Sequence, residues 1–99
     1  MLIDNQEYKV LAIKEDDLGL AQSNEIKKII ELELKNGVKF IALDLNELNS
    51  INSAGLGVLI GILNKVKAQK GSLKMLNINE RIINIFRITK LDLVFEINK

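Results

Sequence analysis

Four residue types with distinctive chemistry are absent from the sequence: cysteine, histidine, tryptophan and proline. Without cysteine the chain forms no disulfide bond and offers no thiolate ligand to a metal ion. Without histidine it lacks an imidazole ligand and the base of every Ser-His or Cys-His nucleophile pair. The acidic side chains are scattered and form no evident catalytic constellation. We therefore expect no enzyme activity, no cofactor and no metal site.

An excess of one charge sign is also missing, and aromatic residues are few. The 14 basic and 13 acidic residues leave a formal net charge of +1, whereas nucleic-acid-binding domains usually carry a basic stripe. One tyrosine and three phenylalanines offer no obvious stacking platform for bases. We therefore expect no nucleic acid among the partners of this protein.

Long apolar runs are missing as well. The longest uncharged apolar stretch, from Ala54 to Leu63, is too short to span a bilayer. The first residues, MLIDNQEYK, have neither the basic nor the apolar region of a signal peptide. Together with the missing cysteines, these features predict a cytoplasmic protein that does not insert into a membrane.

What remains is a sequence of ordinary globular character. It has 99 residues, of which 47% are hydrophobic and 27% are charged. No proline-rich linker, low-complexity run or repeat divides it. We expect one domain that spans residues 1–99.

Apolar periodicity along the chain alternates between the two regular periods. A period of two predicts strands, and a period of 3.6 predicts helices. The strands are expected at 2–3, 8–14, 40–45, 73–78 and 91–97, with a turn at 15–19. Helices are expected around 26–34 and 54–68, and a third follows Asn79 with Ile82, Ile85 and Phe86 on one face. We expect Gly37 and Gly71 to end the first two helices and Asn79 to cap the third. The order predicts a single small α/β domain, a mixed sheet of four to five strands with packed helices.

The most informative segment is SINSAGLGVLIG, residues 50–61. The simplest role for Ser53 is to cap the N-terminus of the helix at 54–68, because a serine hydroxyl accepts a hydrogen bond from a free backbone N–H there. Such a cap contributes about 1 kcal/mol. The same position favours an anion, since a helix N-terminus is the positive end of its dipole. A cap and an anion site are therefore compatible at Ser53.

Three glycines, Gly55, Gly57 and Gly61, lie in this predicted helix. Each costs a helix about 1 kcal/mol relative to alanine, so their presence needs a reason. Close packing is a sufficient reason, because Gly57 and Gly61 lie four apart on one face. Nucleotide binding is a weaker alternative: the loop at 46–52 separates the glycines from the preceding strand, and no G-K-[ST] follows.

The same helix carries two apolar stripes, where a surface helix needs only one. One comprises Leu56, Leu59, Ile60 and Leu63, and the other Val58, Ile62 and Val66. The second stripe is either covered by a neighbouring helix or exposed as a surface for a partner.

The stretch INSAGLGVLIGILNKVK, preceded by FIALDLNELNS, resembles the central motif of the anti-sigma factor antagonist family, the STAS domains. That motif is a buried strand, a short loop, Asp-Ser-[Ser/Thr]-Gly-Leu-Gly and an apolar helix. The ending RIINIFRITKLDLVFEI resembles the helix, loop and strand that close the family's fold. The resemblance implies that Ser53 is a phosphoacceptor. It also implies that a partner contacts the residues around it, namely Asn52, Ala54, Gly55, Leu56 and Gly57.

The resemblance further implies the partner and the mechanism. The partner would be an anti-sigma factor that is also an ATP-dependent serine kinase. The unphosphorylated antagonist would bind it and free the sigma factor, phosphorylation would release the antagonist, and a serine phosphatase would reset the cycle. The antagonist itself would not be an enzyme but a phosphoprotein that regulates transcription through protein–protein interaction.

The sequence departs from the family pattern at two positions. Asn52 stands where an Asp usually precedes the serine, and Gly19, in EDDLG at 15–19, replaces an Asp expected near the phosphoacceptor. These departures keep a second hypothesis open, a STAS scaffold or subunit module, as in lipid-transport complexes, that is not phosphorylated. A small nucleotide-binding domain remains the third.

Overall fold

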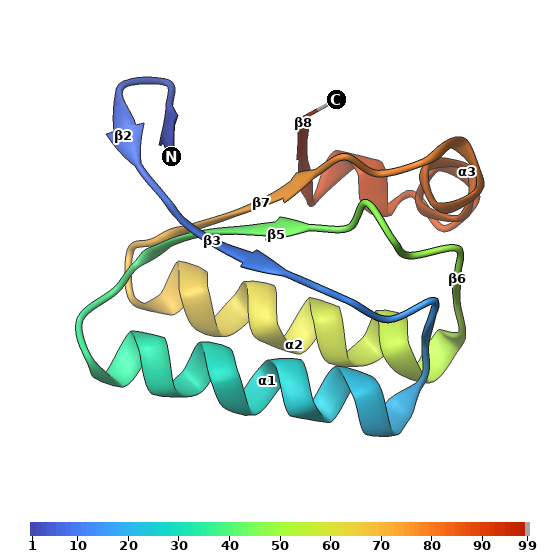
Figure 1. The fold of residues 1–99 in the computed structure, drawn as a ribbon, viewed down its shortest axis with the longest axis horizontal. Coiled ribbons are helices and arrows are strands. Elements are labelled where there is room, and N and C mark those ends of the chain that lie inside the picture. The colour runs from blue at the N-terminus through green and yellow to red at the C-terminus, as the bar shows by residue number, and fades with distance from the viewer. Residues whose placement is uncertain (99) are drawn as a thin grey trace.

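The computed structural model of the protein describes residues 1–98, and its main feature is a sheet covered on one face by two long helices (Figure 1). The helices are α1 (Leu20–Lys35) and α2 (Ser53–Ala68), which run side by side, and a shorter helix, α3 (Glu80–Ile88), lies at one end of the sheet. The first residues of the chain lie on the side of the sheet away from α1 and α2. The predicted α/β fold is confirmed.

The main sheet has four strands in the order β3-β5-β7-β8, and all three pairings are parallel. The strands are β3 (Lys9–Ala12), β5 (Phe40–Asp44), β7 (Ser72–Leu76) and β8 (Glu96–Asn98). Helix α1 connects β3 to β5 and α2 connects β5 to β7, because parallel neighbours need a crossover. The stretch predicted as a central strand therefore lies inside the sheet as β5.

Two small strand pairs complete the sheets. Strands β1 (Leu2–Ile3) and β2 (Gln6–Glu7) form an antiparallel hairpin, turned by Asp4 and Asn5 with positive φ angles of 51° and 66°. Strands β4 (Asp17–Leu18) and β6 (Ser50–Ile51) pair in parallel within segments predicted as a turn and a loop. Antiparallel and parallel pairs thus both occur, as the predicted mixed architecture requires, but the main sheet itself is parallel.

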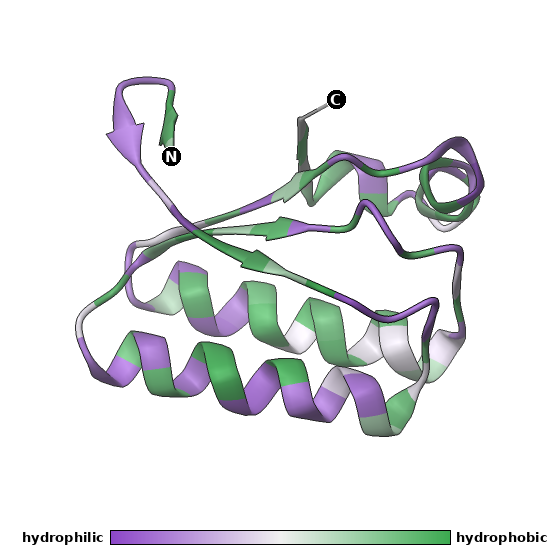
Figure 2. Ribbon diagram, in the orientation of Figure 1, coloured by the Kyte–Doolittle hydropathy of each residue, from purple (hydrophilic) through white to green (hydrophobic). Residues whose placement is uncertain are grey.

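The core lies between the main sheet and the two long helices. Figure 2 shows apolar residues along β5 and α2, whereas α1 alternates between apolar and polar residues. Ile62 and Val66, from the second apolar stripe of α2, are almost completely buried and Val58 is half-buried. The stripe is therefore covered within the fold rather than left for a partner. No helix within residues 1–98 is long and apolar enough to cross a membrane.

The helix ends confirm two of the predicted caps and correct the third. Gly37 follows α1 with a φ of +92°, and Asn79 caps α3 by accepting a hydrogen bond from the Ile82 N–H at 3.0 Å. After α2, Lys70 rather than Gly71 takes the left-handed conformation, with a φ of 61°. Gly71 serves a different purpose, because a Cβ there would lie 2.1 Å from the carbonyl oxygen of Lys39.

The predicted strand at 91–97 is mostly wrong. Residues Leu91–Leu93 form a short 3₁₀ helix, and only Glu96–Asn98 join the sheet. The Leu91 carbonyl accepts hydrogen bonds from the N–H groups of Val94 and Phe95, which closes the turn. Phe95 stacks on Phe86 with ring centroids 5.4 Å apart, whereas Leu93 is 82% exposed. The alternating apolar residues therefore do not share one face.

The contact between Gly71 and Lys39 predicts a difference between two glycine variants. Gly71→Ala should lower the free energy of unfolding by about 1–3 kcal/mol, because its methyl group would collide with the Lys39 carbonyl just before β5. Gly61→Ala should leave stability unchanged or raise it by up to about 1 kcal/mol, because its methyl group meets nothing within 4 Å. Urea unfolding measures both, and equal stability of the two variants would contradict the packing described.

Candidate functional site

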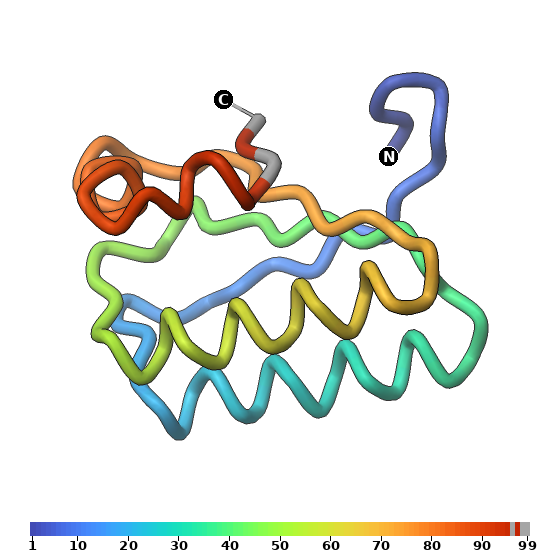
Figure 3. Tube along the Cα trace, turned by 180° about the vertical axis from the view of Figure 1, so that it is seen from behind, coloured from blue at the N-terminus to red at the C-terminus, as the bar shows by residue number. Residues whose placement is uncertain are grey.

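The pairing of β4 with β6 brings the starts of α1 and α2 together. In this parallel pair Asp17 lies opposite Ser50 and Leu18 opposite Ile51. The chain enters α1 through Gly19 and α2 through Asn52, directly after these strands. Both helices therefore begin at the same end of the molecule and run in the same direction, as the views from the front and from behind show (Figures 1 and 3).

Asn52, not Ser53, is the N-cap of α2. The Asn52 Oδ1 accepts a hydrogen bond from the Gly55 N–H at 2.8 Å, and α2 begins at Ser53. The prediction that Ser53 is the cap is therefore wrong by one residue. Asparagine caps a helix as well as serine does, so the helix starts at the earlier of the two. Ser53 is exposed, and its hydroxyl has no hydrogen-bond partner within residues 1–98.

Gly55 is needed where α2 meets β4. A Cβ at this position would lie 2.3 Å from the carbonyl oxygen of Leu18 and 3.1 Å from a side-chain carbon of Ile51. Gly57 and Gly61, by contrast, have nothing within 4 Å of a Cβ. The close-packing explanation, proposed for all three glycines, is thus confirmed for Gly55 and wrong for Gly57 and Gly61. Because Gly57 has no side chain and is exposed, the α2 backbone is accessible to solvent at this position.

The residues that the family resemblance assigns to partner contacts divide into an exposed and a buried group. Asn52, Ala54 and Gly57 are exposed, as is Ser53 between them, whereas Gly55 and Leu56 are buried. The exposed residues form a narrow surface of small side chains over the first turn of α2. Gly55 and Leu56 lie beneath it and hold the turn against the fold.

Gly19 lies beside the cap of α2, as expected from its place in the sequence. A Cβ on Gly19 would lie 3.4 Å from the Asn52 Nδ2. The Gly19 N–H donates a hydrogen bond to the Gln22 side chain at 3.2 Å. The two departures from the family pattern, Asn52 and Gly19, are therefore neighbours in space, and neither brings a carboxylate to the start of α2.

Two carboxylates near this edge are engaged with the segment that leads into β6. Asp16 accepts a hydrogen bond from the Asn49 side chain at 2.6 Å, and Asp17 accepts one from the Ser50 hydroxyl. The Asp16 carbonyl also accepts the N–H groups of Asn49 and Ser50. Sequence reasoning missed these links, because nothing in a single sequence pairs polar residues this far apart along the chain.

The loop between β5 and β6 is anchored from the other side. Asn79 Nδ2 donates a hydrogen bond to the Leu48 carbonyl at 2.8 Å, and Asn77 Nδ2 donates one to Asp44 at 3.0 Å. The Leu48 side chain is fully buried. The start of α2 is therefore presented by a fixed loop rather than a loose one.

This arrangement is suited to carry a negatively charged group on Ser53. First-turn N–H groups and the dipoles of two parallel helices make this end of the pair positive, which stabilises an anion there. A phosphate adds a charge of about −1.5 to −2 and three acceptor oxygens. In the part of the chain that the structure describes, no group of three or more acidic residues could hold a metal ion.

Comparison with known proteins agrees with the fold and the motif. The sequence is 43% identical over 54 residues to the anti-sigma-B factor antagonist of Bacillus subtilis, and this match covers 54% of the chain and 50% of that protein. The chain thus spans half the length of this relative. The crystal structure of a candidate anti-sigma factor antagonist from Thermotoga maritima matches all of this chain and 83% of its own, with a TM-score of 0.79 and 26% identity.

A further solved structure shares the fold at lower identity. SpoIIAA of Bacillus in its phosphorylated form is 20% identical, with a TM-score of 0.67, over 91% of this chain and 81% of its own. The sequence model of the STAS domain family matches residues 6–99, which is nearly the whole chain. Taken with the parallel sheet, the strand-to-helix motif and these relatives, the match shows that the chain belongs to the STAS domain family.

Proposed function

We propose that this protein is an anti-sigma factor antagonist that binds an anti-sigma factor serine kinase and is released when Ser53 is phosphorylated. A serine phosphatase then restores the binding form. The strongest support for this proposal is the position of Ser53. It is exposed, it is the first residue of α2, and its hydroxyl does not cap the helix. A group added to its hydroxyl disturbs no hydrogen bond that the structure records for residues 1–98.

The proposed partner surface is the exposed first turn of α2. It comprises Asn52, Ser53, Ala54 and Gly57, which the buried Gly55 and Leu56 hold in place. Leu20 begins α1 as Ser53 begins α2, and its side chain is 56% exposed. An exposed leucine at the same end of the helix pair adds an apolar group that a partner could contact.

Phosphorylation would then act on binding rather than on folding. A phosphate on Ser53 puts a hydrated double charge at the centre of a surface that binds by close apolar contact, and stripping that hydration is costly. Within the protein the same charge lies at a helix N-terminus, where it is tolerated. Because SpoIIAA has this fold in its phosphorylated form, a fold of this kind accommodates the modification.

We also propose the domain, the location and the partners with which this regulation takes place. Residues 1–99 act as one cytoplasmic domain, without a cofactor and without catalysis of its own. The partners are the kinase and the phosphatase, not a nucleic acid or a membrane. The family supports a regulatory rather than an enzymatic role.

One observation favours a second candidate function, a scaffold or subunit module that keeps the fold without the switch. The start of α2 lacks the carboxylate that the resemblance leads us to expect, since Asn52 is amidic and Gly19 has no side chain. In this case the exposed surface would bind its partner without regulation by phosphate.

Variants at the start of α2 separate capping from signalling. Asn52→Ala should lower the free energy of unfolding by about 1 kcal/mol, because it removes the acceptor for the Gly55 N–H. Ser53→Ala should stay within about 0.5 kcal/mol of the wild type, because an exposed helical residue is replaced by a better helix former. Urea unfolding measures both, and a larger loss from Ser53→Ala than from Asn52→Ala would show that Ser53 is the cap after all.

The switch itself is tested by incubating the protein with its cognate kinase and ATP. Intact mass should rise by one phosphate, and peptide mapping should place it on Ser53. Ser53→Ala should take no phosphate and bind the kinase constitutively, whereas Ser53→Asp should stay folded and bind more weakly. Ser50→Ala is the control for a neighbouring hydroxyl, one that donates a hydrogen bond to Asp17, and this variant should still be phosphorylated. Phosphate on Ser50, Ser72 or Thr89 would refute the assignment, and no phosphate at all would favour the scaffold.

The residue before Ser53 should affect the rate at which the kinase phosphorylates Ser53. Asn52→Asp should keep the cap, because aspartate caps as well as asparagine, and so leave stability nearly unchanged. It should raise the rate of phosphorylation by restoring the acid that the family places there. A time course of intact mass measures the rate, and a slower reaction of the Asp variant would contradict this role for the acid.

A further inference from the structure

Strand β3 forms one edge of the main sheet, and its outer side is unpaired. Among the strands within residues 1–98, it pairs with β5 alone. The Ile13 N–H donates a hydrogen bond to the Asp44 carbonyl at 2.9 Å, which shows that the odd-numbered residues here bond to β5. Because successive residues of a strand direct their backbone groups to opposite sides, the N–H and C=O groups of Val10 and Ala12 point outward. An edge of this kind is a template for a further strand.

The unpaired part of this edge has a defined beginning and end. Just before β3, the Tyr8 N–H donates a hydrogen bond to the Met1 carbonyl at 2.7 Å, and the Tyr8 carbonyl accepts one from the Met1 ammonium at 3.0 Å. The edge is therefore occupied as far as Tyr8. Just after β3, Ile13 turns its N–H toward β5. The open stretch thus offers two donors and two acceptors, from Val10 and Ala12.

This edge lacks the features that usually prevent strand pairing. Proteins protect an exposed edge with a charged side chain, a proline or a bulge. The residues from 10 to 13 are VLAI, without charge or proline, and the register of β3 with β5 is continuous. Lys9 does not reach across the edge, because its ammonium lies 2.6 Å from the Glu33 carboxylate of α1. The edge is therefore suited to another uncharged strand.

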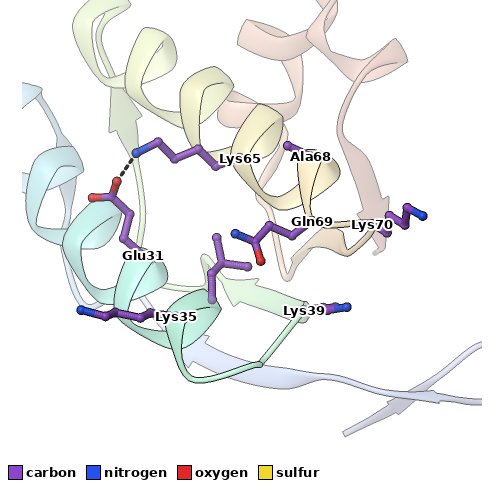
Figure 4. A pocket seen from close by; sticks show the side chains of 8 residues that line it. Glu31, Lys35, Lys39, Lys65, Ala68, Gln69 and Lys70 are labelled. Carbon is purple, nitrogen blue, oxygen red and sulfur yellow. Dashed lines mark hydrogen bonds and ion pairs between the residues drawn. The ribbon is translucent and has the colours of Figure 1, made fainter.

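An apolar strip on α1 lies beside the same edge. Residues three or four apart share a face of a helix, so Ile29 and Leu32 lie near Glu33, on the β3 side of α1. They are 51% and 58% exposed. Glu31, which accepts a hydrogen bond from the Lys65 ammonium of α2, marks the other side of α1 (Figure 4). The exposed pair therefore faces away from α2.

The charges next to this strip are balanced within the chain. We use the term edge surface for Val10, Ala12, Ile29 and Leu32. Two ion pairs border it, from Lys9 to Glu33 at 2.6 Å and from Lys28 to Glu25 at 3.8 Å. Such a surface selects neither an acidic nor a basic partner, and two copies of it do not repel each other.

We propose that two copies of this chain pair through the edge surface, with their β3 strands antiparallel and Val10 of each copy opposite Ala12 of the other. This register uses all four outward backbone groups of each copy. Pairing Val10 with Val10 would instead set Ala12 against Tyr8, whose groups are already bonded. The proposed register also places Lys9 opposite the uncharged Ile13. A second copy matches the edge in length and in lack of charge, and identical chains usually associate about a two-fold axis.

The proposed pairing is separate from the switch at Ser53. Helix α1 packs against α2 and lies between α2 and the edge surface. The start of α2 therefore stays outside the interface, and each dimer presents two copies of Ser53. The proposal does not rest on the proposed function, since dimer formation requires neither a kinase nor phosphate.

Sedimentation equilibrium of the purified protein at concentrations up to about 1 mM tests the pairing. The wild type should approach twice the mass of the chain as its concentration rises. Ile29→Gln/Leu32→Gln should weaken the dimer at least about tenfold, because it removes the apolar contact between the two α1 helices. Ile88→Gln/Leu93→Gln is the matched control, since these residues are 81% and 82% exposed elsewhere, and it should change the dimer constant less than about twofold.

Two outcomes of this experiment would overturn the proposal. One is a monomer at the highest concentration, which would leave the edge to a strand of another protein. The other is equal weakening of the dimer by both double variants. Ser53→Ala should dimerise as the wild type does, so a failed switch and a failed dimer are told apart.

Amide hydrogen exchange of the wild type at low and high concentration locates the interface. The N–H groups of Val10 and Ala12 bond to water in the monomer and should exchange more slowly as the dimer forms. The N–H of Leu11, which points toward β5, is the internal control and should not change. A dimer in which Val10 and Ala12 keep their fast exchange would show that another surface joins the two copies, and would overturn the proposal.

Discussion

The contact of Gly55 with the Leu18 carbonyl is the constraint on which the rest of the site depends. The Leu18 carbonyl accepts a hydrogen bond from the Asn52 N–H at 3.3 Å, and it leaves no room for a side chain at position 55. This contact joins the end of β4 to the first turn of α2. It therefore sets α1 and α2 side by side, with their N-termini at one end and their basic C-termini at the other.

The two ends of the helix pair have opposite character as a consequence. At the N-terminal end the dipoles are positive, the surface is made of small residues, and Asn52 provides the cap. The Ser53 hydroxyl therefore makes no capping hydrogen bond that the proposed phosphate would break. At the C-terminal end the helices border a cleft whose lining includes Lys35, Lys39, Lys65 and Lys70. The parallel connection of strands and helices produces both surfaces, because each helix returns the chain to the same edge of the sheet.

Apolar periodicity predicted most of the helices and strands. A strand that buries one face repeats its apolar residues every two positions, whereas a helix repeats them about every 3.6 positions. The central strand and the Asn79 cap needed only local information, whereas the sequence left open whether the second stripe of α2 is covered. The exact cap of α2 did not follow, since Asn52 and Ser53 are adjacent and cap equally well. The alternating apolar residues Leu91, Leu93, Phe95 and Ile97 led to a wrong strand prediction, because alternation alone does not distinguish a strand from a short turn.

The site could be predicted only in part, because its key contacts join distant segments. That Gly55, rather than Gly57 or Gly61, needs to be glycine depends on Leu18, which a single sequence does not place nearby. The links from Asp16 to Asn49 and from Asp17 to Ser50 have the same origin. The lysine cleft likewise exists only once α1 and α2 lie side by side. Ser53 stays a predicted site, which the local motif suggests through its resemblance to the family.

The most direct test of this account is hydrogen exchange of the protein before and after phosphorylation of Ser53. The central claim is that phosphate changes the surface while Asn52 continues to cap α2. The amides of Gly55 and Leu56, which are bonded to the Asn52 side chain and carbonyl, should then keep their protection, as should the β4–β6 pair. Loss of protection at Gly55 and Leu56 in the phosphorylated protein would show that the modification rearranges the helix start, and would contradict the account.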